Sequence, residues 1–444
     1  MSPLPTLHGP SLETCRRRRE AVLGQLGSAV MILPSAPLRH RSRDTEYRYR
    51  PDSELYYLSG ATEPETLFLL VGGDDPRFVL FVRPRDEAAE LWAGPRLGPD
   101  AAAERYGADE CYSIAELDEK LPGLLQAGDR IHYRLGAGDR ADGFVRRALE
   151  RARASGMRRG SGPRGLIDPG EILDELRLRK DAEEVEAIRV AARISAEGHR
   201  FGAAAIAGGV GEWVVEAAVD AGFRAAGATG PGFPTIVGSG ANGCILHYVD
   251  NRDTIDDGAL VLIDAGAQVA LYNGDITRTY PAAGAFSDTQ RDVYRIVEAA
   301  RRAAVEQVVP GVTIASVHDA AARTMVEGLV ALGVLSGSTD ELFSEAAYKV
   351  FFPHQTSHWL GLDVHDPGNY AKAGESRVLE PGMVFTIEPG LYFRPSVCED
   401  AAARFSGIAV RIEDDVLVTD DGCEVLTASL PTAEHEVEAL VGAR

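Results

Sequence analysis

Two neighbouring stretches decide the fold of the C-terminal half: LVLIDAG, residues 260–266, and YNGDITRTY, residues 272–280. Both are apolar and strand-like, so we predict a hairpin whose turn, centred on residues 269–270, places Asp264 opposite Asp275. Two carboxylates that close cannot both ionise unless a cation separates them or one keeps a proton. For this pair alone, ordinary aspartates at strand ends are the alternative.

Two more acidic residues stand in apolar, strand-like runs. Glu388 lies in MVFTIEPG, residues 383–390, and Glu413 lies in VRIEDDVLV, residues 410–418. The two-residue period of a strand puts Arg411 on the same face as Glu413. A buried carboxylate needs a partner, which is either a metal ion or a salt bridge from Arg411.

Histidines are densest in HQTSHWLGLDVHD, residues 354–366. His354 and His358 imitate the spacing of a zincin helix, but Gln355 stands where that motif needs a catalytic glutamate, so we exclude a zincin. One imidazole combined with four carboxylates is an oxygen-rich ligand set. Such a set suits Mn(II), Mg(II) or Co(II) better than a structural zinc.

Together, four carboxylates and one imidazole predict a site for two divalent cations, with Mn(II) as the expected ion. Its ligands would be Asp264, Asp275, His358, Glu388 and Glu413. Carboxylates can bridge two metals about 3.5–4 Å apart with a hydroxide between them, and that hydroxide is a nucleophile at neutral pH. An open metal position would polarise a carbonyl or receive an amine, which indicates amide hydrolysis near a peptide N-terminus.

Length and composition bound the remaining possibilities. A chain of 444 residues is long enough for two or three domains, and we expect two. The 67 acidic residues outnumber the 46 basic ones, and the formal charge of −21 disfavours nucleic acid as a partner. No apolar stretch approaches the roughly 20 residues of a membrane span, and we see no signal peptide, so we expect no membrane partner.

The five cysteines indicate a reducing compartment. They are odd in number, widely scattered and without a C-x-x-C pair, which argues against a disulfide framework and against a thiolate zinc site. We therefore predict a cytoplasmic protein.

The first third of the chain predicts an α/β domain. A helix is expected from Leu12, with Arg16–Arg19 on its solvated face, followed by strands at Ala29–Pro34, Thr66–Val71 and Arg77–Val82.

A domain boundary is expected near residue 175. The Gly/Pro/Arg-rich segment Arg158–Gly165 breaks the pattern, and Asp181 with Glu184 forms a capping box that starts a new helix. We predict an N-terminal α/β domain over residues 1–175 and a catalytic domain over residues 176–444, including a long helical stretch from Ser287 to Val309.

The same linker contains a G-x-G-x-x-G motif, Gly160–Gly165. It follows a basic helix rather than a strand, so we do not interpret it as a dinucleotide site.

The motifs jointly resemble those of the pita-bread metallopeptidases and, within them, aminopeptidase P, the Xaa-Pro aminopeptidases. The C-terminal resemblance rests on the segments above and on IVGSGANGCILHY, LEPGMVFTIEPGLY and VRIEDD. The N-terminal segments DTEYRYRPDSELYYLSGATEPETLFLLV and ELWAGPRLG resemble this aminopeptidase rather than prolidase or methionine aminopeptidase. The resemblance implies a creatinase/prolidase-like α/β N-terminal domain followed by an α+β pita-bread catalytic domain.

The resemblance also implies a role for each ligand. Asp264 would chelate one metal, His358 and Glu388 would bind the other, and Asp275 and Glu413 would bridge the two. Glu388 would in addition carry a proton from the bridging water to the leaving proline nitrogen.

Further residues are implied around the substrate. His247 and His365 resemble the histidines that steady the scissile carbonyl, and His354 lines the same pocket. Arg411 and Tyr392 resemble residues of the proline-binding side, although either could instead only support its neighbours.

Three more positions bear on assembly and on the substrate. Trp92 resembles a tryptophan that reaches a neighbouring subunit's active site, which implies a homo-oligomer, a dimer or tetramer; packing within one chain is the alternative. Gln355 replaces a usual glycine, and Phe233 replaces a frequent tyrosine. Both departures affect the expected contacts to the substrate's free amine.

The resulting hypothesis is a Mn(II)-dependent aminopeptidase that releases the first residue of peptides with proline in second place. A pita-bread binding protein without catalysis is disfavoured because all five ligands are present. A creatinase-like, metal-free enzyme is disfavoured for the same reason. Prolidase shares the ligands, so only the N-terminal motifs argue against it.

Overall fold

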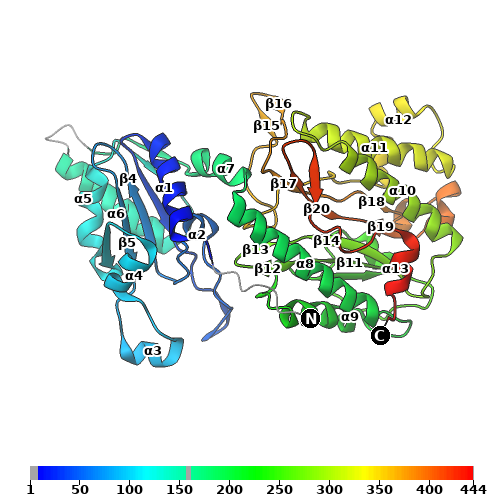
Figure 1. The fold of residues 1–444 in the computed structure, drawn as a ribbon, viewed down its shortest axis with the longest axis horizontal. Coiled ribbons are helices and arrows are strands. Elements are labelled where there is room, and N and C mark those ends of the chain that lie inside the picture. Colours follow the sequence, from blue (N-terminus) through cyan, green and yellow to red (C-terminus); the bar gives the residue numbers. More distant parts are fainter. Residues whose placement is uncertain (1–8, 157–161, 444) are drawn as a thin grey trace. The chain divides into compact units, whose positions relative to one another are not determined.

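The computed structural model describes residues 9–156 and 162–443 and is drawn in Figure 1. Contacts divide the chain into two compact units, with the division between Leu176 and Arg177. The Gly160–Gly165 motif lies partly outside the described residues.

The N-terminal unit is built on a six-stranded mixed sheet of order β6-β5-β4-β1-β7-β8. The strands of this sheet are β1 (Val30–Pro34), β4 (Leu67–Val71), β5 (Arg77–Val82), β6 (Glu110–Ser113), β7 (Arg130–His132) and β8 (Gly165–Ile167). Two short strands, β2 (His40–Ser42) and β3 (Thr45–Glu46), pair separately with each other. Its helices are α1 (Leu12–Leu26), α2 (Ser53–Ser59), α3 (Glu87–Ala93), α4 (Gly98–Tyr106), η1 (Ile114–Glu116), α5 (Leu117–Gln126) and α6 (Asp139–Gly156), and α7 (Gly170–Leu178) crosses the division. The expected α/β architecture and its three predicted strands are confirmed.

The prediction that Arg16–Arg19 form a solvated face was wrong for half of the run. Arg18 and Arg19 are buried, and their guanidinium groups donate hydrogen bonds to the carbonyls of Tyr57 and Leu58 at 3.0 and 2.8 Å. Arg18 also stacks over the Tyr57 ring. Because a guanidinium can satisfy carbonyls and pack on aromatic rings at the same time, helix α1 buries charge where charge patterning alone predicts exposure.

The C-terminal unit combines several small sheets with long helices. Its strands are β9 (Gly230–Pro231), β10 (Ile236–Ser239), β11 (Leu260–Ala265), β12 (Ala267–Val269), β13 (Tyr272–Asn273), β14 (Ile276–Pro281), β15 (Ala371–Lys372), β16 (Glu375–Ser376), β17 (Val384–Ile387), β18 (Gly390–Tyr392), β19 (Ala409–Arg411), β20 (Asp414–Val418) and β21 (Cys423–Val425). Its helices are α8 (Ala182–Ala205), α9 (Glu212–Ala225), η2 (Gly240–Cys244), α10 (Asp288–Glu306), α11 (Ile314–Ala331), α12 (Thr339–Ser344), η3 (Ala347–Val350), η4 (Pro395–Val397), η5 (Asp400–Phe405) and α13 (Glu434–Leu440). Figure 1 shows the strands between the helix pair α8–α9 and the pair α10–α11.

Local signals set the ends of the long helices. Asp181 and Glu184 form the predicted capping box of α8, with both reciprocal hydrogen bonds present. Ser287 caps α10 in the same way, and that helix ends at Glu306, slightly before the predicted Val309.

The hairpin of β11 and β14 exists, but its predicted register was wrong. Asp264 pairs with Thr277 rather than with Asp275, because the turn lies at Ala270 and Leu271, which both have positive φ. Such φ values normally call for glycine or asparagine, so the sequence offers no signal for this turn. The change of two residues keeps both aspartates on one face of the ladder.

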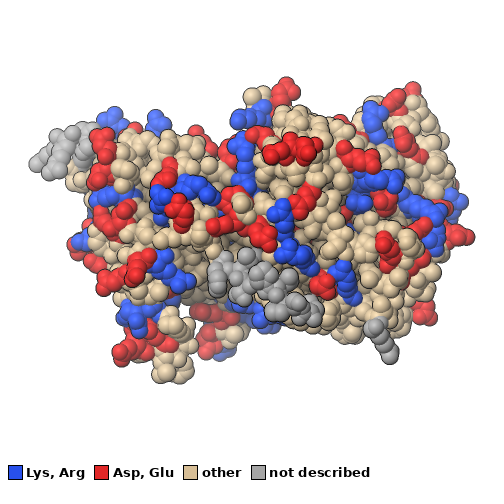
Figure 2. Space-filling model, viewed as in Figure 1, with Lys and Arg blue, Asp and Glu red and all other residues tan. Residues whose placement is uncertain are grey.

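Among the described residues, no helix is both long and apolar enough to cross a bilayer. On the face drawn in Figure 2, acidic and basic side chains are interspersed, and the basic ones form no continuous area there. All five cysteines are free thiols.

Candidate metal centre and active site

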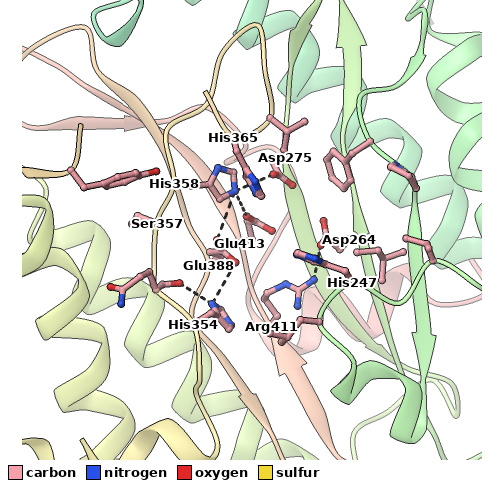
Figure 3. Close-up of a pocket in the computed structure, with 18 residues that line it drawn as sticks. His247, Asp264, Asp275, His354, Ser357, His358, His365, Glu388, Arg411 and Glu413 are labelled. Atoms are coloured by element: carbon pink, nitrogen blue, oxygen red, sulfur yellow. Dashed lines mark hydrogen bonds and ion pairs between the residues drawn. The ribbon is translucent and has the colours of Figure 1, made fainter. Parts of the chain in front are cut away.

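A cavity of about 710 Å³ in the C-terminal unit brings the predicted site together (Figure 3). Nine of the predicted residues line it: His247, Asp264, Asp275, His354, His358, His365, Glu388, Arg411 and Glu413. Gln355 and Phe233 line it as well, so both departures border the site. Tyr392 lies behind this wall, and Trp92, in the N-terminal unit, is 89% exposed.

The four carboxylates stand at the ends of strands or at breaks between them. Asp264 is near the end of β11, Asp275 immediately precedes β14 and Glu388 immediately follows β17. Glu413 occupies the break between β19 and β20, where its backbone forms an isolated bridge to Thr277. At such positions a side chain can point into a cavity without interrupting a hydrogen-bonded ladder.

The imidazole of His358 has its ligand atom directed at the carboxylates. Its Nδ1 lies 3.1 Å from the carbonyl oxygen of Trp359 and must donate its hydrogen there. In the neutral ring, the Nε2 lone pair then faces oxygens of Asp275, Glu388 and Glu413 at 3.4, 3.7 and 3.9 Å. A lone pair facing carboxylate oxygens is unfavourable unless a proton or a cation lies between them.

The carboxylates show the electrostatic cost of this arrangement. Burial, together with the charge of Asp264, raises the pKa of Glu413 to about 7. Burial and the charge of Glu413 raise the pKa values of Asp275 and Glu388 well above their ordinary range. Without a bound cation, protons therefore occupy part of the site near neutral pH.

Arg411 supplies part of the missing positive charge. Its Nη2 lies 2.6 Å from Asp264 Oδ2. A salt bridge from Arg411, which the sequence offered as the alternative to a metal ion, is therefore present for Asp264. Arg411 Nε donates to the hydroxyl of Thr277, which in turn donates to Glu413 at 2.6 Å. Arg411 Nη1 also donates to the hydroxyl of Tyr392 at 2.9 Å.

His354 is held as a neutral ring. Its Nδ1 donates to the carbonyl of Gln355 at 2.8 Å, so its Nε2 accepts from the Tyr392 hydroxyl at 2.9 Å. Burial and the charge of Arg411 lower the pKa of His354 to about 3. The 3.7 Å approach of His354 Nδ1 to Glu388 is therefore a contact with a neutral ring and not an ion pair. The segment is also non-helical, as expected once a zincin is excluded.

His365 and His247 border the same cavity from irregular segments. The ring of His365 lies 4.4 Å from that of His358, edge to face. Burial and the neighbouring His358 lower the pKa of His365. A neutral imidazole can donate one hydrogen bond to a carbonyl oxygen.

Two buried carboxylates, which sequence patterns did not reveal, hold these segments. Glu212 accepts hydrogen bonds from Ser239, Asn242, Tyr248 and the backbone of Asp253, on both sides of His247. Five donors on one buried carboxylate fix the path of the His247 segment.

Asp366 has the corresponding place beside His365. It pairs with Arg177 at 2.6 Å and with Lys180 at 3.1 Å, and it accepts from the backbone N–H of Asp363. Burial alone would raise its pKa, but the charges of Lys180 and Arg177 hold the pKa of Asp366 below its ordinary value. Glu212 and Asp366 stand outside the apolar patterns that mark ligand strands, which is why they were missed.

The residues present fit a divalent metal. Within the described chain, one ligand atom each from Asp275, His358 and Glu413 lie within 4.8 Å of one another. Asp264 Oδ1 is buried and has no hydrogen-bond partner, although its sister oxygen is paired with Arg411. An orphaned carboxylate oxygen beside this cluster is the expected sign of a cation ligand.

Comparison with known proteins identifies the family. A model of metallopeptidase family M24 matches residues 186–420, and a model of the aminopeptidase P N-terminal domain matches residues 15–132. The chain is 43% identical to the Xaa-Pro aminopeptidase of Escherichia coli over 435 residues, which cover 97% of this chain and 98% of that protein. This chain belongs to metallopeptidase family M24.

Solved structures agree with this membership. The M24 chain superposes on Pseudomonas aeruginosa aminopeptidase PepP with a TM-score of 0.94 at 43% identity, covering 98% of this chain and 99% of that one. It matches zinc-substituted E. coli aminopeptidase P in complex with product with a TM-score of 0.94 at 42% identity, covering 98% and 99%. The expected pita-bread architecture behind an α/β N-terminal domain is therefore confirmed, and the chain is a metallopeptidase.

The raised pKa values predict how metal binding depends on pH. Glu413 titrates near 7 in the folded protein and near 4.5 when solvated, so its protonated form stabilises the metal-free fold at low pH, and this contribution is lost as pH rises through about 7. Metal binding requires the deprotonated carboxylates. We expect Mn(II) to raise the unfolding temperature of EDTA-treated protein more at pH 8 than at pH 5.5, as measured by scanning fluorimetry.

The variant Glu413→Gln removes both this titration and an expected ligand, so it should reduce the Mn(II) shift at both pH values. An equal Mn(II) shift at both pH values in the wild-type protein would contradict the assignment of Glu413 to the metal site.

Proposed function

We propose that this M24 enzyme is a dinuclear-metal aminopeptidase that releases the N-terminal residue from peptides with proline in second place. One observation carries the proposal: the lone pair of His358 and four carboxylates meet in one cavity, in a chain 43% identical to an Xaa-Pro aminopeptidase along nearly its whole length. The ligands would be shared between two Mn(II) ions as the sequence predicts. Bound there, two cations would supply an activated hydroxide for attack on the Xaa-Pro bond and would polarise its carbonyl.

Glu388 is the best candidate for moving the proton. Its side chain is 19% exposed, more than those of Asp264, Asp275 and Glu413, so it is the acidic group most accessible from the cavity. Burial and the charge of Glu413 raise the pKa of Glu388, and a raised pKa makes a carboxylate a better proton acceptor. Glu388 would thus protonate the proline nitrogen as the bond breaks.

Neutral histidines suit the carbonyl side of the reaction. His365, whose pKa is lowered, and His247 on the opposite segment would donate hydrogen bonds to the carbonyl oxygen as negative charge develops on it. His354, Tyr392 and Arg411 form one hydrogen-bonded chain that would border the proline ring.

The substrate's amine would lie near Phe233, which lines the cavity and brings no hydroxyl to it. An open position on the bound metal would then be the main partner of the free amine.

A substrate panel tests the proposal. We expect cleavage of Ala-Pro-Ala with added Mn(II), at least about a hundredfold slower cleavage of Ala-Ala-Ala, and loss of activity in EDTA, measured by release of free alanine. Activity that survives chelation would refute the metal mechanism, while cleavage restricted to Ala-Pro would indicate a prolidase instead.

Replacement of Glu388 tests its assigned role. We expect Glu388→Ala to lower kcat at least about a thousandfold, because the proton acceptor and one ligand are both lost. The matched control is Glu375→Ala, an exposed glutamate in the same unit that does not line the cavity. A Glu388→Ala enzyme that kept most of its turnover would contradict the role.

We also propose a homo-oligomer, a dimer or tetramer, in which Trp92 contacts a second copy. Leu91 and Trp92 are 81% and 89% exposed, side by side on a short helix, and exposed aromatic residues of this kind are enriched at interfaces. We expect light scattering to report more than one subunit per particle, and Trp92→Ala to reduce that number. A wild-type monomer would refute the proposal.

The cytoplasmic location stays a prediction that cell fractionation would check. It is supported by five free thiols and the absence of a disulfide among them.

A further inference from the structure

A second hollow adjoins the proposed catalytic cavity. It has a volume of about 400 Å³, and three residues line both spaces: Gln355, Ser357 and Tyr370. Ile314 and Ser376 line the hollow but not the catalytic cavity. The hollow therefore begins where the cavity wall ends, and Gln355 stands at the junction.

Two polar side chains at this junction, those of Gln355 and Ser357, have no hydrogen-bond partner in the described chain. Gln355 is exposed, and within the described chain its side-chain amide makes no hydrogen bond. Ser357 Oγ is buried and has no partner in the described structure. An amide with two donors and an acceptor, beside a free hydroxyl, matches the alternating N–H and C=O groups of a peptide backbone.

The lining of the hollow carries no charge that would attract ions. Its residues include no lysine, arginine, aspartate or glutamate. The one imidazole, His318, is already bonded to Thr356 Oγ1 at 2.8 Å and to the Tyr348 hydroxyl at 3.2 Å. The space thus suits a neutral peptide segment.

The direction in which the substrate would lie brings the residues after proline to this hollow. If Glu388 delivers a proton to the proline nitrogen, the departing peptide lies on the side of Glu388 and of His354, which is 3.7 Å from it. Gln355 follows His354 in the chain, so the residues after proline would run past its amide.

We propose that the hollow is the subsite for the peptide residues that follow proline, and that the Gln355 amide binds their backbone and favours longer substrates. Gln355 is then a specificity-determining residue. The inference rests on the proposed function of the same site.

Kinetics on amidated peptides test the subsite, because amidation removes the terminal carboxylate. The readout is the kcat/KM ratio of Ala-Pro-Ala-Ala-NH₂ to Ala-Pro-NH₂. We expect Gln355→Ala to lower this ratio about fivefold, the factor expected for one neutral hydrogen bond. Gln25→Ala, an exposed glutamine of helix α1, is the matched control and should leave the ratio as in the wild type.

A charge variant provides an independent readout. We expect Gln355→Lys to raise the kcat/KM ratio of Ala-Pro-Glu-Ala-NH₂ to Ala-Pro-Gln-Ala-NH₂ at least about fivefold, because an ammonium at the junction attracts the carboxylate. Both ratios staying at their wild-type values, in an enzyme that cleaves these peptides, would overturn the subsite alone. A wild-type enzyme that cleaves none of them would overturn the proposed function and the subsite with it.

Discussion

Arg411 is the one lysine or arginine among the described residues that line the catalytic cavity, and it faces four carboxylates there. One guanidinium cannot balance four negative charges in a buried space, and the raised pKa values of Asp275, Glu388 and Glu413 express that imbalance. The deficit is what makes the site a receptor for cations. A chain that balanced its own charge at this place would gain stability and lose its affinity for metal.

Several buried charged groups around the cavity follow a different rule, since they have charged or hydrogen-bonding partners within the protein. Glu212 takes five hydrogen bonds, Asp366 is bound by Lys180 and Arg177, and Arg278 is enclosed by Asp414 and several backbone carbonyls. Truncating one partner of such a network leaves an uncompensated buried charge. Paired groups thus hold the segments of the histidines in place around a cavity whose own carboxylates lack balancing charge.

Much of this was predictable from the sequence, because acidic residues in apolar strands and helix caps are local signals. The gathering of the four carboxylates and His358, the capping box of α8 and the strands around Asp264 and Glu388 were predicted in this way. Features that depend on tertiary contacts were not predictable from the sequence. Arg18 and Arg19 are buried because carbonyls and aromatic rings from distant segments meet them, and Glu212 is recognisable only once five donors converge on it. The hairpin register was predicted wrongly because Ala270 and Leu271 adopt a turn with positive φ, which alanine and leucine do not normally indicate.

That register has a chemical consequence. Residues directly opposite each other in an antiparallel pair share one face, so Thr277 occupies the place across from Asp264 that the predicted register assigned to Asp275. The Thr277 hydroxyl accepts a hydrogen bond from Arg411 and donates one to Glu413. The two-residue difference thus puts a neutral hydroxyl, bonded to both Arg411 and Glu413, at the place across from Asp264 that the predicted register gave to a second carboxylate. The position of one turn thereby decides which side chain stands across the ladder from a buried carboxylate of the cavity.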